Sequence, residues 1–332
     1  MNRIAACLAM LLSLSFGAVL HAQTETECAD DAQLIVHAMG ETCVPKDVER
    51  VVALEWSYTE DLLALGIQPI AIADIAGYNN WLKIPITLDE NVQDIGTRNE
   101  PNLEVITQLN PDLIIGVFFR VTENYDDLSA IAPTIVFNPY PADGASHFDE
   151  MITTFETIAK AVNREAEAAV VLEQMQDYFA QASTLIEEAG HSGEGFILSQ
   201  SFLSSEVPTF RLFTSNAMAV EVLEQMGLQN DWTAEPELYG FTTVDMEAFV
   251  DIEDTNFFYV AQDDYNATLT ETPLWNSLPF VTSGRTYWMG GDVWLFGGPL
   301  SAQVLVDTVL QAMGIELPAP EATPEATVEA SS

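Results

Sequence analysis

Along most of the chain, short runs of apolar residues alternate with longer segments in which apolar residues recur at helical spacing. Short apolar runs bounded by turn residues are typical of buried strands, whereas apolar residues three and four positions apart indicate one face of a helix. A repeated order of strand, helix and strand predicts an α/β fold with a largely parallel sheet. The expected strands are Arg50–Leu54, Pro69–Ala73, Asp112–Val117, Gly195–Ser199 and Asn256–Gln262.

Two helix starts carry recognisable caps. Ser57 and Glu60 have the spacing of a capping box, which predicts that a helix begins there, and Gly66 is a residue typical of a helix end. Asn102 is expected to cap another helix, because its side chain can accept hydrogen bonds from the first free backbone N–H groups.

The middle of the chain interrupts this alternation with helical segments. Apolar residues at helical spacing over Phe148–Val162 predict one long amphipathic helix, and a second helical segment from Arg164 to about Ala189 follows it almost directly. After Gly190 the alternation resumes, with a helix expected over Asn216–Met226. No Pro/Ser-rich linker separates the two halves, so we expect two α/β lobes that are joined rigidly.

The two ends of the chain differ from the rest. Arg3 precedes the nearly apolar stretch Ile4–Val19, and Ala22 is a small residue suited to cleavage, which together predict a secretory signal peptide and a periplasmic protein. The low complexity of Pro318–Ser332 predicts a disordered tail. The expected division is a signal peptide at 1–22, an N-terminal segment at 23–44, a first lobe at 45–145, a connecting helix at 146–163, a second lobe at 164–317 and an acidic tail at 318–332.

The cysteine content agrees with export. Cys7 lies in the predicted signal peptide, so the exported protein would retain an even pair, Cys28 and Cys43. In an oxidising compartment such a pair predicts one disulfide that staples the N-terminal segment. A metal site is the weaker alternative, because only His37 lies between the two thiols.

Charge narrows the range of partners. The 332 residues include 51 Asp and Glu against 10 Lys and Arg, a net charge of −41, while hydrophobic residues make up 48%. A globular chain with this excess repels phosphate backbones and anionic lipid, which argues against nucleic-acid binding and against electrostatic docking to a membrane. A surface adapted to solubility or salt is the simplest explanation of the charge.

Catalytic motifs are missing from the sequence. It contains no GxSxG, GxxxxGK[ST] or HExxH motif and no GxGxxG at a strand-to-helix turn. His37, His147 and His191 are scattered, and we expect them at the surface. Carboxylates are so abundant that close pairs arise by chance. We therefore expect a protein that is not an enzyme.

Large aromatic residues gather in segments that would border a cleft. Loops at the strand ends of open α/β sheets line the ligand crevice, and aromatic side chains there suit a bulky, partly apolar ligand. Trp56 stands at a strand-to-helix edge, where core packing is an equally good explanation, and Trp275 is expected in the core. The residues expected in loops are Tyr78, Trp81, Arg98, Tyr239 and Trp294.

Five segments in order resemble the periplasmic iron–siderophore-binding proteins of ABC importers, above all the ferric hydroxamate-binding member. They are RVVALEWSYTEDLLALGIQPIAIAD (50–74), IGTRNEPNLEVITQLNPDLII (95–115), SNAMAVEVLEQMGLQNDW (215–232), TPLWNSLPFVTSGR (272–285) and GDVWLFGGPLSA (291–302). The resemblance implies two Rossmann-like α/β lobes joined by a long rigid helix, and a cleft that captures an iron(III)-siderophore. It implies no cofactor and no metal site of the protein's own, because the siderophore supplies the ligands of the iron.

The resemblance also assigns roles to single residues. Arg98 matches the arginine that donates to hydroxamate oxygens, although an ion pair with one of the many acids is the alternative for it. Trp81 and Trp294 match pocket tryptophans, and Tyr239 stands where the hydroxamate binder has another tryptophan. The family's pocket tyrosine has no clear counterpart, and Phe119 and Arg120 occupy that region. The expected ligand-binding residues are Trp56, Tyr78, Trp81, Arg98, Phe119, Arg120, Tyr239 and Trp294.

A second implied role concerns the membrane partner. The family presents one glutamate per lobe to arginines of the inner-membrane permease, which points to Glu104 in the first lobe and to Glu221, or its neighbour Glu224, in the second. Each could instead be an ordinary surface residue, and Glu104 in the first turn of a helix also complements the helix dipole. The protein is expected to act as a monomer.

Charge also ranks the candidate ligands. A ferric tris-catecholate is strongly anionic and needs clustered cations, whereas a neutral or cationic ferric hydroxamate conflicts least with a protein of charge −41. Cobalamin, haem or another iron chelate are the alternatives within the same importer class, and an exported enzyme or a sensor on the same scaffold is the alternative outside it. Between Arg50 and the tail, the only cations outside the helical middle are Lys83, Arg98, Arg120, Arg211 and Arg285.

Overall fold

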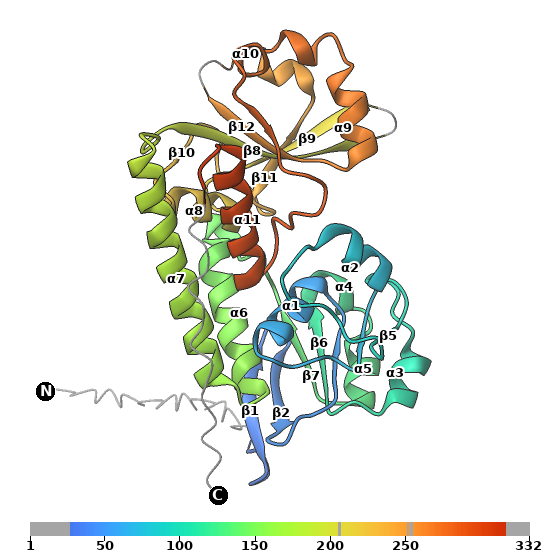
Figure 1. Ribbon diagram of the computed structural model, residues 1–332. Helices are drawn as coiled ribbons and strands as arrows, with labels where there is room; N and C mark the ends of the chain where they lie inside the picture. The colour runs from blue at the N-terminus through green and yellow to red at the C-terminus, as the bar shows by residue number, and fades with distance from the viewer. Residues whose placement is uncertain (1–26, 205–206, 251, 253–254, 317–332) are drawn as a thin grey trace, which may run out of the picture.

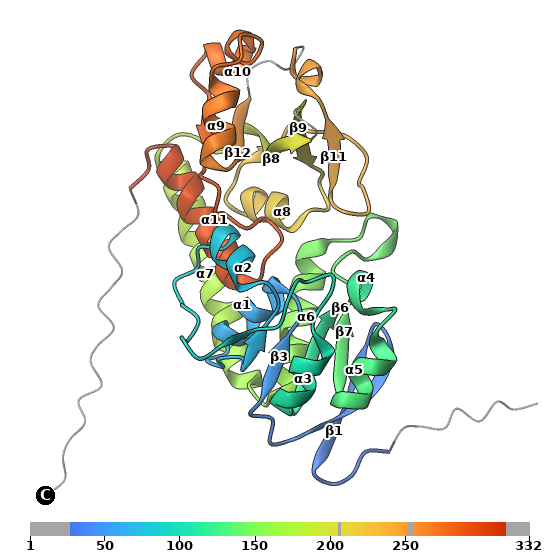
Figure 2. The same ribbon diagram turned by 90° about the vertical axis from the view of Figure 1, so that its right-hand side faces the viewer.

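A computed structural model describes residues 27–204, 207–250, 252 and 255–316; the predicted signal peptide at 1–22 and the predicted tail at 318–332 lie outside them. Two α/β lobes lie one above the other, and the helices α6 (His147–Ala161) and α7 (Glu165–Glu188) run beside them (Figures 1 and 2). The predicted fold class is confirmed. The residue boundaries proposed for the lobes stay a prediction.

The first lobe contains a five-stranded parallel sheet. Its strands run in the order β5-β4-β3-β6-β7, and every neighbouring pair is parallel. The central strands are buried along their whole length, which is typical of a parallel sheet that helices cover on both faces. The strands are β3 (Val51–Ala53), β4 (Ala71–Ile72), β5 (Gln93–Asp94), β6 (Leu113–Val117) and β7 (Thr134–Phe137).

Five short helices connect these strands. The cap of α3 is the predicted one, since the Asn102 side chain accepts hydrogen bonds from the backbone N–H groups of Glu104 and Val105, both at 3.1 Å. The helices are α1 (Trp56–Ala64), α2 (Ile75–Trp81), α3 (Leu103–Leu109), α4 (Phe118–Val121) and α5 (Tyr125–Ile131), and a 3₁₀ turn, η1, covers Ala142–Gly144.

The predicted capping box at the start of α1 is wrong. The helix begins at Trp56, one residue earlier, and its cap is Glu55, whose Oε1 accepts a hydrogen bond from the Trp56 N–H at 3.0 Å. Ser57 donates instead to the carbonyl of Phe296 at 2.8 Å, and Glu60 turns toward a distant helix. Ser57 and Glu60, which the spacing predicted to cap the helix, therefore form contacts with residues far away in the sequence.

The loop predicted around Tyr78 and Trp81 is also wrong, because both residues belong to α2. Asp74 caps this helix by accepting a hydrogen bond from the N–H of Gly77 at 3.0 Å. A Cβ on Gly77 would lie 2.4 Å from the ring of Trp56, so a glycine is needed where the helix packs on that ring.

The helices α6 and α7 lie against both lobes. Ser146 caps α6 by accepting a hydrogen bond from the N–H of Asp149 at 2.9 Å. The helix α6 contacts α1 of the first lobe and α8 (Met218–Gln225) of the second, and it also contacts the N-terminal strand β1 (Ala32–His37). The helix α7 packs against α6, α8 and the last helix, α11 (Pro299–Ala312). This helical layer contacts elements of both lobes and so connects them.

The second lobe has a mixed sheet. Its strands run in the order β11-β9-β8-β12-β13, with β10 also paired to β8. The strand β8 (Gly195–Ser204) is five residues longer than predicted, and its extension pairs antiparallel with β9 (Val207–Phe213). The remaining elements are β10 (Gln229–Asn230), β11 (Phe241–Val244), η2 (Met246–Phe249), β12 (Asn256–Val260), α9 (Asp263–Thr270), η3 (Trp275–Ser277), α10 (Pro279–Thr282) and β13 (Thr286–Trp288).

A small hairpin of β1 and β2 (Gly40–Pro45) precedes the first lobe. Cys28 and Cys43 form a disulfide with a Cα–Cα distance of 5.5 Å, which confirms the predicted staple. Trp275 is 1% exposed in the core of the second lobe, as expected. Within the described part of the chain, no helix is both long and apolar enough to cross a membrane.

Candidate functional site

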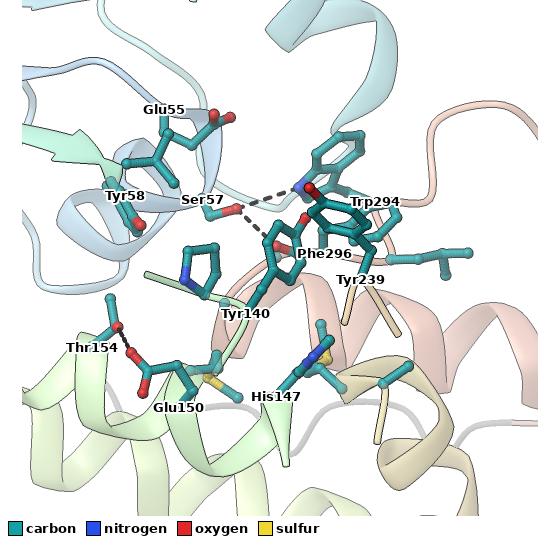
Figure 3. A pocket seen from close by; sticks show the side chains of 18 of the residues that line it. Glu55, Ser57, Tyr58, Tyr140, His147, Glu150, Thr154, Tyr239, Trp294 and Phe296 are labelled. Atoms are coloured by element: carbon teal, nitrogen blue, oxygen red, sulfur yellow. Dashed lines mark hydrogen bonds between the residues drawn. The ribbon is translucent and has the colours of Figure 1, made fainter. Parts of the chain in front are cut away.

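A cavity of about 520 Å³ lies between the two lobes. Its wall combines residues from α1 and from the loops of the first lobe, from the start of α6, from the sheet of the second lobe and from the loop before α11 (Figure 3). Aromatic rings and arginines dominate the wall. They are Tyr58, Arg98, Phe119, Arg120, Tyr140, Arg211, Phe213, Tyr239, Phe241, Trp294 and Phe296.

Arg98 and Arg120 share one carboxylate. Nη1 of Arg98 donates to Oε1 of Glu55 at 2.7 Å, and Nε of Arg120 donates to Oε2 at 2.9 Å. The guanidinium of Arg98 also stacks on Trp56, with Cζ 3.4 Å from the ring centre. Arg120 donates a further hydrogen bond to the side chain of Asn99. The ion-pair alternative for Arg98 is therefore correct, and Arg98 lines the cavity as well.

The loop before α11 brings Trp294 to the cavity. The carbonyl of Phe296 in this loop accepts the hydrogen bond from Ser57, which ties the loop to α1 (Figure 3). Glu60 of α1 accepts hydrogen bonds from the N–H groups of Gly298 and Ser301 and from the Ser301 hydroxyl, at 2.6–3.0 Å. Glu60 is fully buried, and burial raises its pKa above the ordinary value.

Tyr140 is the centre of an aromatic cluster that the sequence did not reveal. Its ring stacks on Phe119 with centroids 5.6 Å apart. It also meets the ring of Tyr239 edge-on at 5.0 Å, and both tyrosines are seen in Figure 3. Burial is the main cause that raises the pKa of Tyr140 to about 12. The only available signal was its position, just after the end of the buried strand β7, where ligand crevices of α/β sheets form.

His147 contradicts the expectation of a surface histidine. It lies at the start of α6, is 8% exposed and meets the ring of Tyr140 at 5.4 Å. Burial lowers its pKa to about 4, so the imidazole is neutral at pH 7. A neutral ring completes an apolar wall and adds no charge to the cavity.

The second lobe contributes one arginine. Arg211 of β9 donates to the side chain of Gln200 at 2.8 Å and lies over the ring of Phe241, 4.7 Å from its centre. Among the ion pairs of the described residues, none includes Arg211. From the sequence, Arg211 is one of the available cations, but it is not among the expected ligand-binding residues.

Two further carboxyl groups line the cavity, and burial raises the pKa of both. Asp61 is 3% exposed, and its Oδ1 has no hydrogen-bond partner among the described atoms. Glu150 of α6 accepts a hydrogen bond from Thr154 at 3.2 Å (Figure 3). Raised pKa values favour the neutral carboxylic acids, which can donate as well as accept hydrogen bonds.

Five of the eight predicted ligand-binding residues line the cavity: Arg98, Phe119, Arg120, Tyr239 and Trp294. The other three are not among the lining residues. Trp56 is 2% exposed beneath Arg98, Tyr78 is 3% exposed in α2, and Trp81 packs edge-on against Trp294 with centroids 6.4 Å apart. The rings of Trp56 and Trp81 thus contact the lining residues Arg98 and Trp294, and a ligand-binding role for all three stays a prediction.

The three glutamates predicted to face the permease differ in exposure. Glu104 in α3 and Glu224 in α8 are exposed. Glu221 is half-buried, and its Oε2 accepts a hydrogen bond from the hydroxyl of Ser146 at 3.0 Å. Burial raises the pKa of Glu221.

Comparisons with known proteins identify the family of this chain. Residues 51–293 match the periplasmic binding protein family. The iron(3+)-hydroxamate-binding protein FhuD of Escherichia coli is 31% identical over 271 residues, 81% of this chain and 88% of the relative. The Fe(3+)-citrate-binding protein YfmC of Bacillus subtilis is 30% identical over 285 residues, 85% of this chain and 86% of the relative.

Solved structures give the same result. The siderophore-binding protein FhuD of Vibrio cholerae, bound to Fe³⁺-Desferal, superposes with a TM-score of 0.73 at 28% identity, over 80% of this chain and 98% of that one. No group of three or more His, Cys, Asp or Glu side chains that could hold a metal occurs among the described residues. This chain belongs to the periplasmic binding protein family, whose members bind solutes and are not enzymes.

Proposed function

We propose that this protein is the substrate-binding component of an ABC importer and that it captures an iron(III)-siderophore, of hydroxamate type, between its lobes. The observation that carries the proposal is the cavity, to which both lobes contribute aromatic rings and arginines. A bulky chelate needs apolar walls for its linkers and charged donors for its oxygens, and guanidinium groups are suited to paired oxygens.

The fit to a hydroxamate rests on the mixture of charges. Arg98, Arg120 and Arg211 are accompanied by Glu55 and by two carboxyl groups of raised pKa. A ferric trihydroxamate has polar oxygens around the iron without a large negative charge, which such a wall can solvate. A ferric citrate is the second candidate, because one relative of 30% identity binds it and three arginines line the cavity.

Delivery to a membrane permease completes the proposal. It requires export to the periplasm, cleavage of the signal peptide near Ala22, and a docking face of carboxylates that the permease reads with arginines. The exposed Glu104 and Glu224, one on each lobe, are available for such contacts, and no oligomeric partner is needed.

Tryptophan fluorescence tests the ligand directly. Trp294 lines the cavity and the ring of Trp56 packs against it, so an iron-loaded ligand should quench the emission. Titrations with ferric Desferal, iron-free Desferal, ferric citrate, cobalamin and haem should give saturable quenching with the first at micromolar concentration or below. Failure of all iron-loaded ligands to bind would overturn the proposal.

A matched variant separates the cavity from the rest of the protein. Trp294→Phe should reduce the quenching, with Trp56 still reporting the ligand, whereas Trp288→Phe, which changes a tryptophan outside the cavity wall, should leave the quenching in place. Tight binding of cobalamin or haem in preference to ferric Desferal would assign the protein to another ligand of the same importer class.

A further inference from the structure

Glu55 holds a position that neither the sequence nor the resemblance assigned. Its side chain caps α1, is 8% exposed and forms part of the cavity wall. Each carboxylate oxygen binds a different arginine, at 2.7 Å for Arg98 and 2.9 Å for Arg120. One carboxylate therefore neutralises half of the positive charge that the first lobe presents to the cavity.

Both arginines nevertheless keep donors for a ligand. Arg98 donates one hydrogen bond to Glu55 from Nη1, and Arg120 donates one from Nε. The remaining N–H groups of each guanidinium are not bonded to Glu55. The opposite wall carries Arg211, which has no carboxylate partner among the described residues. The cavity thus offers many donors but a limited net charge.

We propose that Glu55 determines which ligand charge the cavity accepts, an inference that rests on the proposed function. With its carboxylate between them, Glu55 leaves the pair of arginines one net positive charge instead of two, so the wall attracts an anionic ligand less strongly and a ferric complex without net negative charge is accepted. Without that carboxylate the same wall carries two positive charges close together at low solvent exposure. Such a wall favours an anionic ferric carboxylate, because Coulomb attraction is strong where water is largely excluded.

The test compares two probes on one protein. Ferric Desferal carries no net negative charge, and ferric citrate is anionic. Dissociation constants for both are measured by fluorescence at fixed pH and salt, and their ratio is compared between the parent and Glu55→Gln. We expect the ratio of the citrate constant to the Desferal constant to fall at least tenfold in Glu55→Gln.

Two further variants separate the effect of the lost charge from the effect of a changed structure. Glu55→Asp retains the carboxylate and should restore most of the parent ratio, although its shorter side chain costs some stability. Glu100→Gln makes the same change of charge at an exposed site near Arg98 that does not line the cavity, and should leave the ratio within twofold of the parent.

Loss of the α1 cap is a risk for Glu55→Gln, so Arg120→Gln provides a second route. This variant leaves Glu55 paired with Arg98 alone and should raise the ratio at least fivefold. An unchanged ratio in the folded variants overturns the inference while the proposed function stands. If the parent binds neither probe, the proposed function fails first, and the inference falls with it.

Discussion

The hydroxyl of Ser301 donates a hydrogen bond of 2.6 Å to Oε2 of Glu60, and this bond joins α1 of the first lobe to the start of α11. The other oxygen of Glu60 accepts from the backbone N–H groups of Gly298 and Ser301, so the carboxylate caps a helix that lies 238 residues away in sequence. A Cβ on Gly298 would lie 2.3 Å from Oδ1 of Asp61, so a larger residue would have to displace that buried side chain.

We predict a large loss of stability in Glu60→Ala. The substitution leaves buried N–H groups at the start of α11 without a partner, which costs about 3 kcal/mol. Urea unfolding of the variant should show this loss, whereas Glu187→Ala on the exposed face of α7 should change the free energy of unfolding by less than about 0.5 kcal/mol. Equal effects of the two substitutions would contradict the role given to Glu60.

Arg98→Ala should weaken the binding of the siderophore by about 2–4 kcal/mol, because a donor to ligand oxygens is lost while Glu55 keeps its pair with Arg120. Arg211→Gln should weaken the binding free energy by about 2 kcal/mol, because the opposite wall of the cavity loses its charged donor. Trp81→Ala should cost less than Trp294→Ala, since Trp81 only supports the ring of Trp294. Calorimetry on the folded variants measures these losses, and parent-like affinity of Arg98→Ala would remove Arg98 from the site.

His147 predicts a dependence of stability on pH. Its pKa is about 4 in the folded protein, below the ordinary value of 6.5, so the unfolded chain binds the proton first as the pH falls. The stabilising contribution is present above pH 6.5 and is lost between pH 6.5 and 4, by about 2 kcal/mol at pH 5. Buried carboxyl groups of raised pKa act in the opposite sense, so the measurement is the difference between the parent and His147→Gln. A difference that stays constant from pH 7.5 to 4.5 would refute the prediction.

The disulfide should be present and stabilising in the exported protein. Thiol labelling of the unreduced, unfolded chain should find neither Cys28 nor Cys43 free. The double variant Cys28→Ser with Cys43→Ser should lose about 3 kcal/mol, because the unfolded chain regains the freedom of the closed loop. Two labelled thiols in the mature protein would reject the bridge.

Docking to the permease should depend on the exposed glutamates. We expect Glu104→Ala combined with Glu224→Ala to leave siderophore affinity intact and to reduce uptake and association with the permease, more so at low salt. Glu221→Ala is the matched control within α8, because its carboxylate is already bound to Ser146. Normal transport by the double variant, with Glu221 also dispensable, would show that these carboxylates are part of the general acidic surface.

Local signals identified most of the elements. The caps of short helices, as at Asn102, and the buried runs of β3, β6 and β12 depend on neighbours in sequence, so they could be predicted. The signal failed at Ser57 and Glu60, where a local motif was outcompeted by partners more than two hundred residues away. The antiparallel pairing of β8 with β9 was not predicted, because an apolar run indicates a strand but not whether its neighbour in the sheet runs parallel or antiparallel.

The sequence by itself determined the fold class, the disulfide and the residue types of the site, because periodicity, cysteine count and motif spacing are properties of short segments. Only the tertiary structure decided how these side chains meet. It paired Arg98 and Arg120 with one carboxylate, brought Arg211 to the opposite wall, and left Trp56 and Trp81 out of the lining of the cavity. The reason is that burial and ion pairing are set by the packing of segments that lie far apart in the sequence. With 51 acidic residues against 10 basic ones, the sequence cannot indicate which carboxylate meets which arginine.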